Sequence, residues 1–404
     1  MNEEIGNLLE FVTAGEWGKE QGTQQGIDTG VIRSANFTKD HQFNEKEIII
    51  RSIDERKRQK KMLKRGDILI EKSGGSPDQP VGRVLFYDRE GEHTCSNFIS
   101  ILRPSKRVEP KFLYYALCNL YREGVVKNYQ QQTTGIINLQ LGEYLREKIY
   151  SPPIPEQKKI AMILSEIDKC ISLIDLKIEK LDFLFNAQRQ KFLEKQSNWN
   201  QYKISDIADP SEKYSLTGGP FGSDLKVSDY RENGIRVIQL QNIEDSNFNH
   251  KNRIFTSLEK ANSLMSSNIF GGDLIIAKMG DPVAKCTIVP NNLSRCLMSS
   301  DGIRLKVNQK IFDNFFIELS INSPYFRKKT NEISTGTTRQ RIGLQEFRNL
   351  TIACPHINEQ RKISQIMRSI KNANFDLDNR KFILKNLKIG LSSDLLSGQR
   401  RIDV

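Results

Sequence analysis

The stretch PEQKKIAMILSEIDKCISLIDLKIEKLDFLFNAQRQKFLEK, residues 155–195, decides the fold, and it contains no Gly and no Pro after its first residue. Apolar side chains recur along it at alternating spacings of four and three residues, which predicts one long helix with a heptad seam. Pro155 suits the first turn of that helix, and Glu156 suits the positive end of its dipole. The expected seam residues are Ile160, Leu164, Ile167, Ile171, Ile174, Ile178, Leu181 and Phe185. Such a seam requires a partner helix.

The partner helix is expected near the C-terminus, where NEQRKI at 358–363 repeats PEQKKI at 155–160, 203 residues further along. Its apolar seam residues are Ile363, Met367, Ile370, Leu377 and Leu384. Three further seam positions are polar, whereas the equivalent positions of the first helix carry Ile171, Ile178 and Phe185; the polar residues are Asn374, Lys381 and Lys388. Polar seam residues cost stability but fix the register and the choice of partner.

The chain before each helix is also repeated. GDILI at 66–70 corresponds to GDLII at 272–276, and Asn36 corresponds to Asn242, both 206 residues apart. A period this long indicates a duplicated domain. Short β-rich runs are mixed with helical stretches such as 111–122 without strict alternation, which favours two similar α+β domains. The expected organisation is a first domain at 1–154, a long helix at 155–197, a second domain at 198–355, and a second long helix with a tail at 356–404.

Composition sets limits on location and chemistry. The 404 residues are 37% hydrophobic without a run of eighteen apolar residues, and the acidic N-terminus lacks the pattern of a signal peptide, so we expect a cytoplasmic protein without membrane contact. Six cysteines are scattered without a CxxC pair, and buried reduced thiols are their simplest interpretation. Four dispersed histidines offer no zinc spacing, so no metal site is expected.

The formal charge of +12 and the pI near 9.3 indicate a polyanionic partner. The densest basic cluster lies at 56–65, and it is either a solvated helix face or a phosphate-contacting one. Two polar segments, 130–135 and 334–341, are either nucleic-acid loops or plain surface turns, because Gln, Thr and Arg can read base edges. With neighbouring basic residues, the candidate DNA contacts are Arg56, Lys57, Arg58, Lys60, Lys61, Lys72, Arg83, Gln131, Thr133, Thr134, Lys278, Lys285, Thr337, Thr338, Arg339 and Arg341.

A catalytic constellation is missing from the sequence. It contains no GxxxxGK[ST], HExxH or GxSxG pattern, and the glycine-rich segment 218–223 lacks the Lys of a phosphate loop. Ser151-Pro152-Pro153 lacks both the amide and the aromatic residue of the motif that amino-methyltransferases use. Three Glu-x-Lys matches fall on predicted helices or helix starts, where nuclease metal ligands are not expected. We therefore predict no catalytic residue and no cofactor in this chain.

Two divergent domains, each followed by a long helix that opens with Glu-Gln-Lys/Arg-Lys-Ile, resemble the specificity subunit of a type I restriction-modification enzyme. The most specific matches are Pro152–Gln157 and Pro355–Gln360, with Gly219–Ser223 in support. The resemblance implies two target-recognition domains, which read the two parts of a split, asymmetric site on double-stranded DNA, and two helices packed as an antiparallel coiled coil. It also implies two modification subunits that hold S-adenosylmethionine and methylate adenine, and restriction subunits that translocate DNA with ATP and cleave it.

Two other functions stay open at this stage. A self-contained methyltransferase or nuclease would bind its cofactor as an isolated chain, although the missing motifs oppose it. A structural two-domain adaptor would show no DNA footprint in the assembled complex. The resemblance favours a non-catalytic subunit that binds DNA through salt-sensitive phosphate contacts and a few base-reading side chains in each domain.

Overall fold

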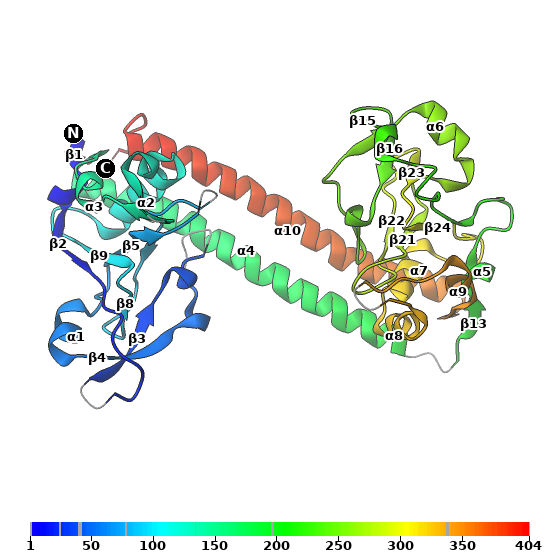
Figure 1. Cartoon of the computed structure of the whole chain (residues 1–404), viewed down its shortest axis with the longest axis horizontal. Helices are drawn as coiled ribbons and strands as arrows, with labels where there is room; N and C mark the ends of the chain where they lie inside the picture. The colour runs from blue at the N-terminus through cyan, green and yellow to red at the C-terminus, as the bar shows by residue number, and fades with distance from the viewer. Residues whose placement is uncertain are drawn as a thin grey trace. The chain divides into compact units, whose positions relative to one another are not determined.

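The computed structural model describes residues 2–23, 26–38, 43–76, 79–133, 135–194, 198–336 and 339–403 (Figure 1). The chain divides into two compact units: unit 1 comprises Met1–Asp175 with Asp378–Val404, and unit 2 comprises Leu176–Leu377. Each unit therefore contains one α+β body and part of each of the two long helices. None of the described helices is long and apolar enough to cross a lipid bilayer.

The body of unit 1 is built around a four-stranded antiparallel sheet of order β2-β9-β5-β7. Smaller sheets have the orders β4-β3-β8, β10-β11-β6 and β1-β12. The strands are β1 (Asn2–Glu4), β2 (Leu9–Ala14), β3 (Ile27–Ile32), β4 (Ile49–Ile53), β5 (Ile68–Glu71), β6 (Ser73–Gly74), β7 (Val84–Phe86), β8 (His93–Cys95), β9 (Ile99–Pro104), β10 (Gln130–Thr133), β11 (Ile136–Leu139) and β12 (Lys148–Tyr150). The helices are α1 (Glu55–Lys61), α2 (Pro110–Arg122) and α3 (Leu141–Tyr144), with short 3-10 helices at Ile5–Leu8, Ser34–Asn36, Glu45–Glu47 and Val125–Tyr129.

Unit 2 repeats this plan with the sheets β14-β24-β21-β22, β15-β19-β16-β23-β20, β13-β25 and β17-β18. Its strands are β13 (Asn200–Lys203), β14 (Leu216–Gly218), β15 (Tyr230–Arg231), β16 (Ile235–Ile238), β17 (Ile243–Glu244), β18 (Asn247–Phe248), β19 (Ile254–Thr256), β20 (Asn268–Ile269), β21 (Leu274–Ala277), β22 (Cys286–Ile288), β23 (Cys296–Met298), β24 (Gly302–Leu305) and β25 (Thr351–Cys354). Its helices are α5 (Ile204–Ile207), α6 (Leu258–Ser263), α7 (Asn314–Ile321), α8 (Pro324–Ile333) and α9 (Leu344–Asn349), with 3-10 helices at Val227–Asp229, Leu240–Asn242 and Met265–Ser267. The pairings β3–β8 and β16–β23 are both parallel, which confirms the duplication.

The two Gly-Asp strand starts have a shared structural cause. Asp67 accepts hydrogen bonds from Arg103 at 2.8 Å and from the backbone N–H of Lys64 at 2.7 Å. Asp273 accepts from Arg304 at 2.6 Å and from the backbone N–H of Phe270 at 3.0 Å. Both aspartates are buried, so each needs its arginine partner. The repeated Asp therefore fastens the start of the central strand to the neighbouring strand.

The long helices are α4 (Ile154–Glu194) and α10 (Ile357–Ser397). Every predicted seam residue of both helices is buried or half-buried, whereas Met162, Phe183 and Phe382 on other faces are exposed. The two helices contact each other within each unit, and the contacts run in opposite directions along them, as in an antiparallel coiled coil. The predicted heptad seam and its partner helix are thus confirmed.

The polar seam residues of α10 pair with aspartates of α4 at intervals of seven residues. In unit 1, Lys388 donates to Asp168 at 2.6 Å, and Lys381 pairs with Asp175. In unit 2, Asn374 donates to Asp182. From pair to pair the residue number on α4 rises by seven while the residue number on α10 falls by seven. The three pairs therefore share one antiparallel register.

The glutamine in the opening motif of each long helix joins that helix to its α+β body. Gln157 accepts from the backbone N–H of Glu109, the residue before α2, at 2.8 Å and donates to the Pro152 carbonyl at 2.8 Å. Gln360 makes the equivalent contacts with Asp313, the residue before α7, at 2.9 Å and with Pro355 at 2.8 Å. Each glutamine is 1% exposed. The repeated motif therefore has a structural role at both helix starts.

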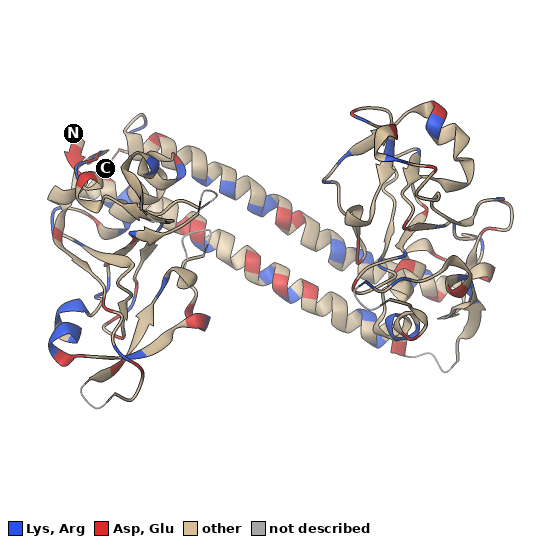
Figure 2. Cartoon of the chain, viewed as in Figure 1, with Lys and Arg blue, Asp and Glu red and all other residues tan. Residues whose placement is uncertain are grey.

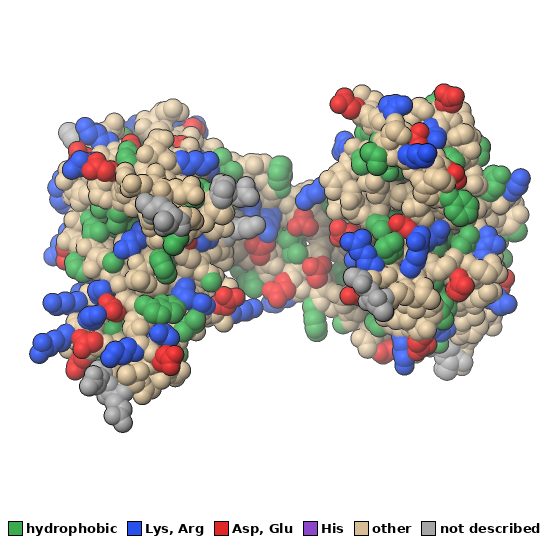
Figure 3. Space-filling view, in the orientation of Figure 1, with side chains coloured by type: hydrophobic (Ala, Val, Ile, Leu, Met, Phe, Trp, Pro, Cys, Tyr) green, Lys and Arg blue, Asp and Glu red, His purple; other side chains and the backbone are tan. Residues whose placement is uncertain are grey.

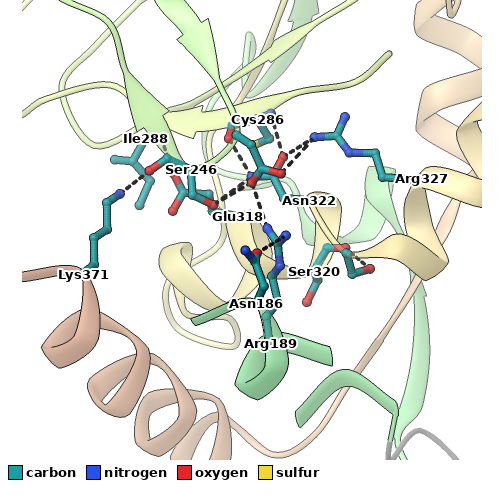
Figure 4. Close-up of polar contacts among 12 residues, drawn as sticks. Asn186, Arg189, Ser246, Cys286, Ile288, Glu318, Ser320, Asn322, Arg327 and Lys371 are labelled. Carbon is teal, nitrogen blue, oxygen red and sulfur yellow. Dashed lines mark hydrogen bonds and ion pairs between the residues drawn. The ribbon is translucent and has the colours of Figure 1, made fainter. Parts of the chain in front are cut away.

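In unit 2 a polar network connects the body to both long helices (Figure 4). Asn322, at the end of α7, donates to the Ser246 hydroxyl at 3.0 Å and accepts from Arg327 at 2.7 Å. Lys371 of α10 donates to the Ser246 carbonyl, and Arg189 of α4 donates to neighbouring Asp245 at 2.8 Å. The turn between β17 and β18 is thereby hydrogen-bonded to the end of α7, to α10 and to α4.

Candidate nucleic-acid interface

In unit 1 the predicted Gln/Thr segment forms a hairpin beside the residue that follows β5. The backbone carbonyl of Lys72 accepts from the N–H of Leu139 at 2.8 Å, and β6 pairs with β11 of the hairpin. The Ser73 hydroxyl donates to the Asn138 side chain at 2.6 Å. Gln131 is exposed on β10, while Thr134 and the side chain of Thr133 lie outside the described residues. Lys72 and the polar segment therefore belong to one surface cluster.

Unit 2 places the equivalent residues in the same relation. The backbone carbonyl of Lys278 accepts from the N–H of Ile342 at 2.9 Å, and Gly280 donates to the Gln340 carbonyl at 3.1 Å. Thr335 and Arg341 exchange two backbone hydrogen bonds, which close the 334–341 loop. Arg339 and Arg341 are exposed, whereas Thr337 and Thr338 lie outside the described residues. The two segments that the sequence singled out thus occupy equivalent sites.

The glycine-rich segment 218–223 joins this cluster in unit 2. A Cβ atom on Gly219 would lie 1.8 Å from the Ser299 carbonyl oxygen, and one on Gly218 would lie 2.6 Å from the Lys278 ammonium. Close packing against backbone therefore requires glycine at position 219, whereas at position 218 the Lys278 side chain could move aside. Phe221, in the same segment, is 82% exposed.

Electrostatics around Lys278 depend on its partial burial. Burial lowers the pKa of Lys278, the nearby Arg341 lowers it further, and Asp301 opposes this shift. Arg341 donates to Asp301 at 2.7 Å, and the Lys278 ammonium donates to the Ser300 carbonyl at 3.3 Å. The two cations thus lie close to a single carboxylate, so the cluster attracts anions.

Lys and Arg are concentrated on helix α1, which Figure 2 colours largely blue, and Figure 3 shows basic side chains on the surface of the body of unit 1. Some of the α1 side chains are held in ion pairs. Lys57 and Lys61 pair with Glu16 at 3.0 and 2.9 Å. Burial alone would raise the pKa of Glu16, but the hydrogen bonds from these lysines lower it overall. Arg56 and Lys60 are exposed and have no ion-pair partner among the described residues. Phosphate contacts from α1 would therefore come mainly from these two.

Arg83 departs from its predicted role. It is 7% exposed, and its guanidinium donates to both carboxylate oxygens of Glu71 at 2.9 and 3.1 Å and to the Phe37 carbonyl at 3.0 Å. A DNA contact requires an accessible side chain, so the prediction for Arg83 is wrong. The remaining predicted contacts are Arg58, which is half-buried and donates to Thr29 at 3.0 Å, and Lys285, which is half-buried beside β22.

Cysteine thiols and clusters of metal-ligating side chains are the groups on which nucleophilic or metal chemistry would depend. No group of three or more His, Cys, Asp or Glu residues is placed there to hold a metal ion. Burial raises the pKa of Cys118 and of Cys354 to about 12, and that of Cys296 to about 11. These thiols stay protonated at neutral pH and are poor nucleophiles. The six cysteines are free.

Comparison with known proteins yields one family. The family model for the type I restriction modification DNA specificity domain matches residues 2–182 and 196–385. The type I restriction enzyme MjaVIII specificity subunit of Methanocaldococcus jannaschii is 23% identical over 387 residues, which cover 93% of this chain and 86% of that protein. A putative MjaX specificity subunit from the same organism is also 23% identical, over 83% of this chain and 79% of that protein.

Solved structures share the fold. The S subunit of a type I restriction-modification system from M. genitalium superposes with a TM-score of 0.61 at 14% identity, covering 98% of this chain and 96% of that one. A chain from a study of complex assembly and conformational transition in a type I R-M system has a TM-score of 0.59 at 13% identity, covering 99% and 98%.

Proposed function

Because this chain belongs to the family of type I restriction modification DNA specificity domains, we propose that it is the subunit that selects the DNA site for a type I complex. Each α+β body reads one part of a bipartite, asymmetric sequence. The observation that carries this proposal is the repeated cluster beside β5 and β21, where Lys72 and Lys278 meet a polar segment through equivalent backbone hydrogen bonds. The scaffold of the cluster is shared, whereas its exposed side chains differ, as two half-sites of different sequence require.

The chain itself supplies recognition, and the chemistry belongs to partner subunits. Modification subunits hold S-adenosylmethionine and methylate adenine, and restriction subunits cleave the DNA. This division is supported by the family of DNA specificity domains to which the chain belongs. The isolated chain is therefore expected to show no methyl transfer, DNA cleavage or ATP hydrolysis. Turnover that persists after rigorous removal of other subunits would contradict the proposal.

The outer faces of the long helices offer docking surfaces for the modification subunits. On α4, Met162 and Leu173 of unit 1 are 59% and 57% exposed, and Leu176 and Phe183 of unit 2 are 53% and 77% exposed. On α10, apolar residues at intervals of seven are 48–67% exposed: Phe375, Phe382 and Ile389. Rows of large apolar side chains on one helix face are typical of protein interfaces. Replacing Phe183 or Phe382 with Asp should abolish co-purification with modification subunits without lowering the unfolding temperature.

The decisive experiment maps methylation in genomic DNA. The chain is co-expressed with its modification subunits, and methylated adenines are located by sequencing. We expect a single motif of two short defined parts separated by a gap of fixed length. Replacing residues 1–154 by the equivalent domain of a relative should change one part of the motif and leave the other unchanged. A continuous motif, or a change in both parts together, would refute the proposal.

A further inference from the structure

A second exposed feature of unit 2 follows β18, in the segment 249–253, which we call the 249–253 loop. The buried side chain of Asn242 donates to the Asn249 carbonyl at 3.0 Å and to the Lys251 carbonyl at 2.8 Å. The Asn249 N–H donates back to the Asn242 carbonyl at 2.9 Å, and the Asn249 side chain accepts from the Lys251 N–H at 3.0 Å. Asn252 completes the bend with a left-handed φ of 52°. One buried asparagine therefore fixes the shape of the loop.

The hairpin that leads into this loop is also anchored. Ser246, in the β17–β18 turn, accepts from the Asn322 side chain at 3.0 Å and donates its N–H to the Cys286 carbonyl at 3.0 Å (Figure 4). Lys371 of α10 holds the Ser246 carbonyl. The loop is thus organised by the protein core before any ligand arrives, which reduces the entropy that binding would cost.

The loop presents positive charge that is not held in ion pairs among the described residues. His250, Lys251 and Arg253 are exposed, and no ion pair joins Lys251 or Arg253 to a carboxylate among the described residues. The nearest acidic residue along the hairpin is Glu244, whose carboxylate accepts from the Asn249 amide at 3.0 Å. A hollow in the surface is lined by Asn247, Phe248, Asn249, His250, Lys251 and Arg253, together with Glu244.

Beneath the loop lies a buried arginine that has no acidic partner. Arg236 is 6% exposed, and its guanidinium donates to the His250 carbonyl at 3.3 Å and stacks 5.2 Å from the centre of the Phe248 ring. Its Nε–H has no hydrogen-bond partner, and no carboxylate lies within 4 Å of it among the described residues. A buried cation of this kind is unfavourable unless an anion approaches it.

The pKa shifts show the effect of burial and of neighbouring cations in this cluster. Burial lowers the pKa of Arg236, and the charge of Arg253 lowers it further. Burial also lowers the pKa of His250, as do the charges of Arg236 and Arg253. In a site with a matching counter-ion the cationic forms would be stabilised instead. This cluster is hard to predict from sequence, because Arg236 is thirteen or more residues away from the loop that it supports.

We propose that the 249–253 loop, supported by Asn242 and Arg236, is a phosphodiester-binding site through which unit 2 grips the DNA backbone. This inference rests on the proposed function and adds a contact outside the base-reading cluster around Lys278. Lys251 and Arg253 neutralise phosphate charge, and the fixed loop backbone sets where they do so. Such contacts position a protein on the duplex without reading its sequence.

The test uses the full chain assembled with its modification subunits. A Lys251→Ala/Arg253→Ala variant and the wild type are titrated with a cognate and an unrelated duplex between about 50 and 200 mM salt. Losing two phosphate contacts should reduce the slope of log K against log salt by about 1.8, and affinity should fall by the same factor for both duplexes. A control variant removes the same charge at two other exposed residues of unit 2, Lys213→Ala/Lys310→Ala, and should change the slope less.

Every other result of these titrations counts against the loop site. An unchanged slope, or a slope change equal to that of the control, overturns the loop site while leaving the proposed function intact. A loss confined to the cognate duplex would mean that the loop reads bases, which also overturns it. A second arm measures thermal stabilisation by inorganic phosphate alone; stabilisation that the variant loses, with an unchanged DNA slope, assigns the site to free phosphate instead. Failure of the wild-type complex to bind any duplex would overturn the proposed function, and this inference with it.

Discussion

The ion pair between Asp168 of α4 and Lys388 of α10 offers a quantitative test of the helix seam in unit 1. The carboxylate accepts from Lys388 at 2.6 Å and from the Tyr115 hydroxyl of α2 at 2.8 Å, so it joins both helices to the body. The two charged side chains are 28% and 26% exposed. Asp168→Asn removes the charge but keeps an acceptor for Tyr115, and Lys388→Met removes the ammonium but keeps most of the apolar chain. The double variant completes a mutant cycle.

The expected coupling follows from this partial burial. Fully exposed pairs contribute about 0.2–1 kcal/mol, whereas breaking a buried pair costs about 3–5 kcal/mol. A pair that is about three-quarters buried should therefore show a coupling of about 1–2 kcal/mol. For a unit of this size, that corresponds to about 2–8 °C in unfolding temperature. The coupling should decrease at high salt, but only in part, because partly buried pairs are screened less.

The assay can follow unit 1 by itself. The chain has two tryptophans, and Trp17 lies in unit 1 while Trp199 lies in unit 2. In a Trp199→Phe background, fluorescence during unfolding reports on unit 1 alone. The matched control is the pair Glu166–Lys169 on the same helix, whose side chains are 59% and 65% exposed and whose coupling should stay below about 0.5 kcal/mol. A seam coupling no larger than that of the control would refute the reasoning.

Three further predictions test other parts of the structure. Gln360→Ala should lower the free energy of unfolding of unit 2 by about 2–3 kcal/mol, because it leaves the Asp313 N–H and the Pro355 carbonyl unpaired. Urea titration measures this free energy, and a loss below about 0.5 kcal/mol would contradict the prediction. Arg56→Glu/Lys60→Glu in the assembled complex should weaken binding to all duplexes about equally and flatten the salt dependence, and unaltered affinity would restore the interpretation as a solvated helix face. The hydrogen bonds from Arg401 lower the pKa of Glu156, so this pair stabilises unit 1 at neutral pH and loses that contribution as the pH falls below the usual glutamate range near 4.3. The Glu156→Gln variant should therefore be less stable than the wild type at pH 7 and approach its stability in acid. A constant difference in stability at all pH values would contradict this linkage.

Much of the architecture was predictable because the deciding signals are local and repeated. The heptad pattern of α4 requires only helix geometry, and each residue that it assigned to the seam is buried or half-buried. The offset of 206 residues between the two halves predicts which residues are equivalent. Lys72 and Lys278, which it pairs, do make equivalent backbone contacts. The polar seam residues were also assigned to register, and each of the three has an aspartate partner.

The errors and omissions concern contacts between residues that are far apart along the chain. The sequence predicts Arg83 as a DNA contact, yet this side chain neutralises Glu71 in the interior of unit 1. The equivalent of Glu71 in unit 2 is Ala277, so the repeat gave no sign of a buried pair. The sequence does not predict that Asn242 supports the 249–253 loop, since a repeated turn residue and a buried hydrogen-bonding centre look alike in sequence.

Equivalent residues of the two halves also show where the contacts between each body and the long helices differ. Tyr115 of α2 and Glu318 of α7 occupy equivalent positions, and so do Asp168 of α4 and Lys371 of α10, both 203 residues apart. In unit 1 the hydroxyl of Tyr115 donates to the acid on the long helix. In unit 2 the acid lies on the body and the cation on the long helix: burial raises the pKa of Glu318, and the charge of Lys371 opposes that shift. Moving the second body onto the first helix position would set Glu318 opposite Asp168 in place of the Tyr115 hydroxyl. We therefore expect that exchanging the two bodies would require exchanging these helix residues as well.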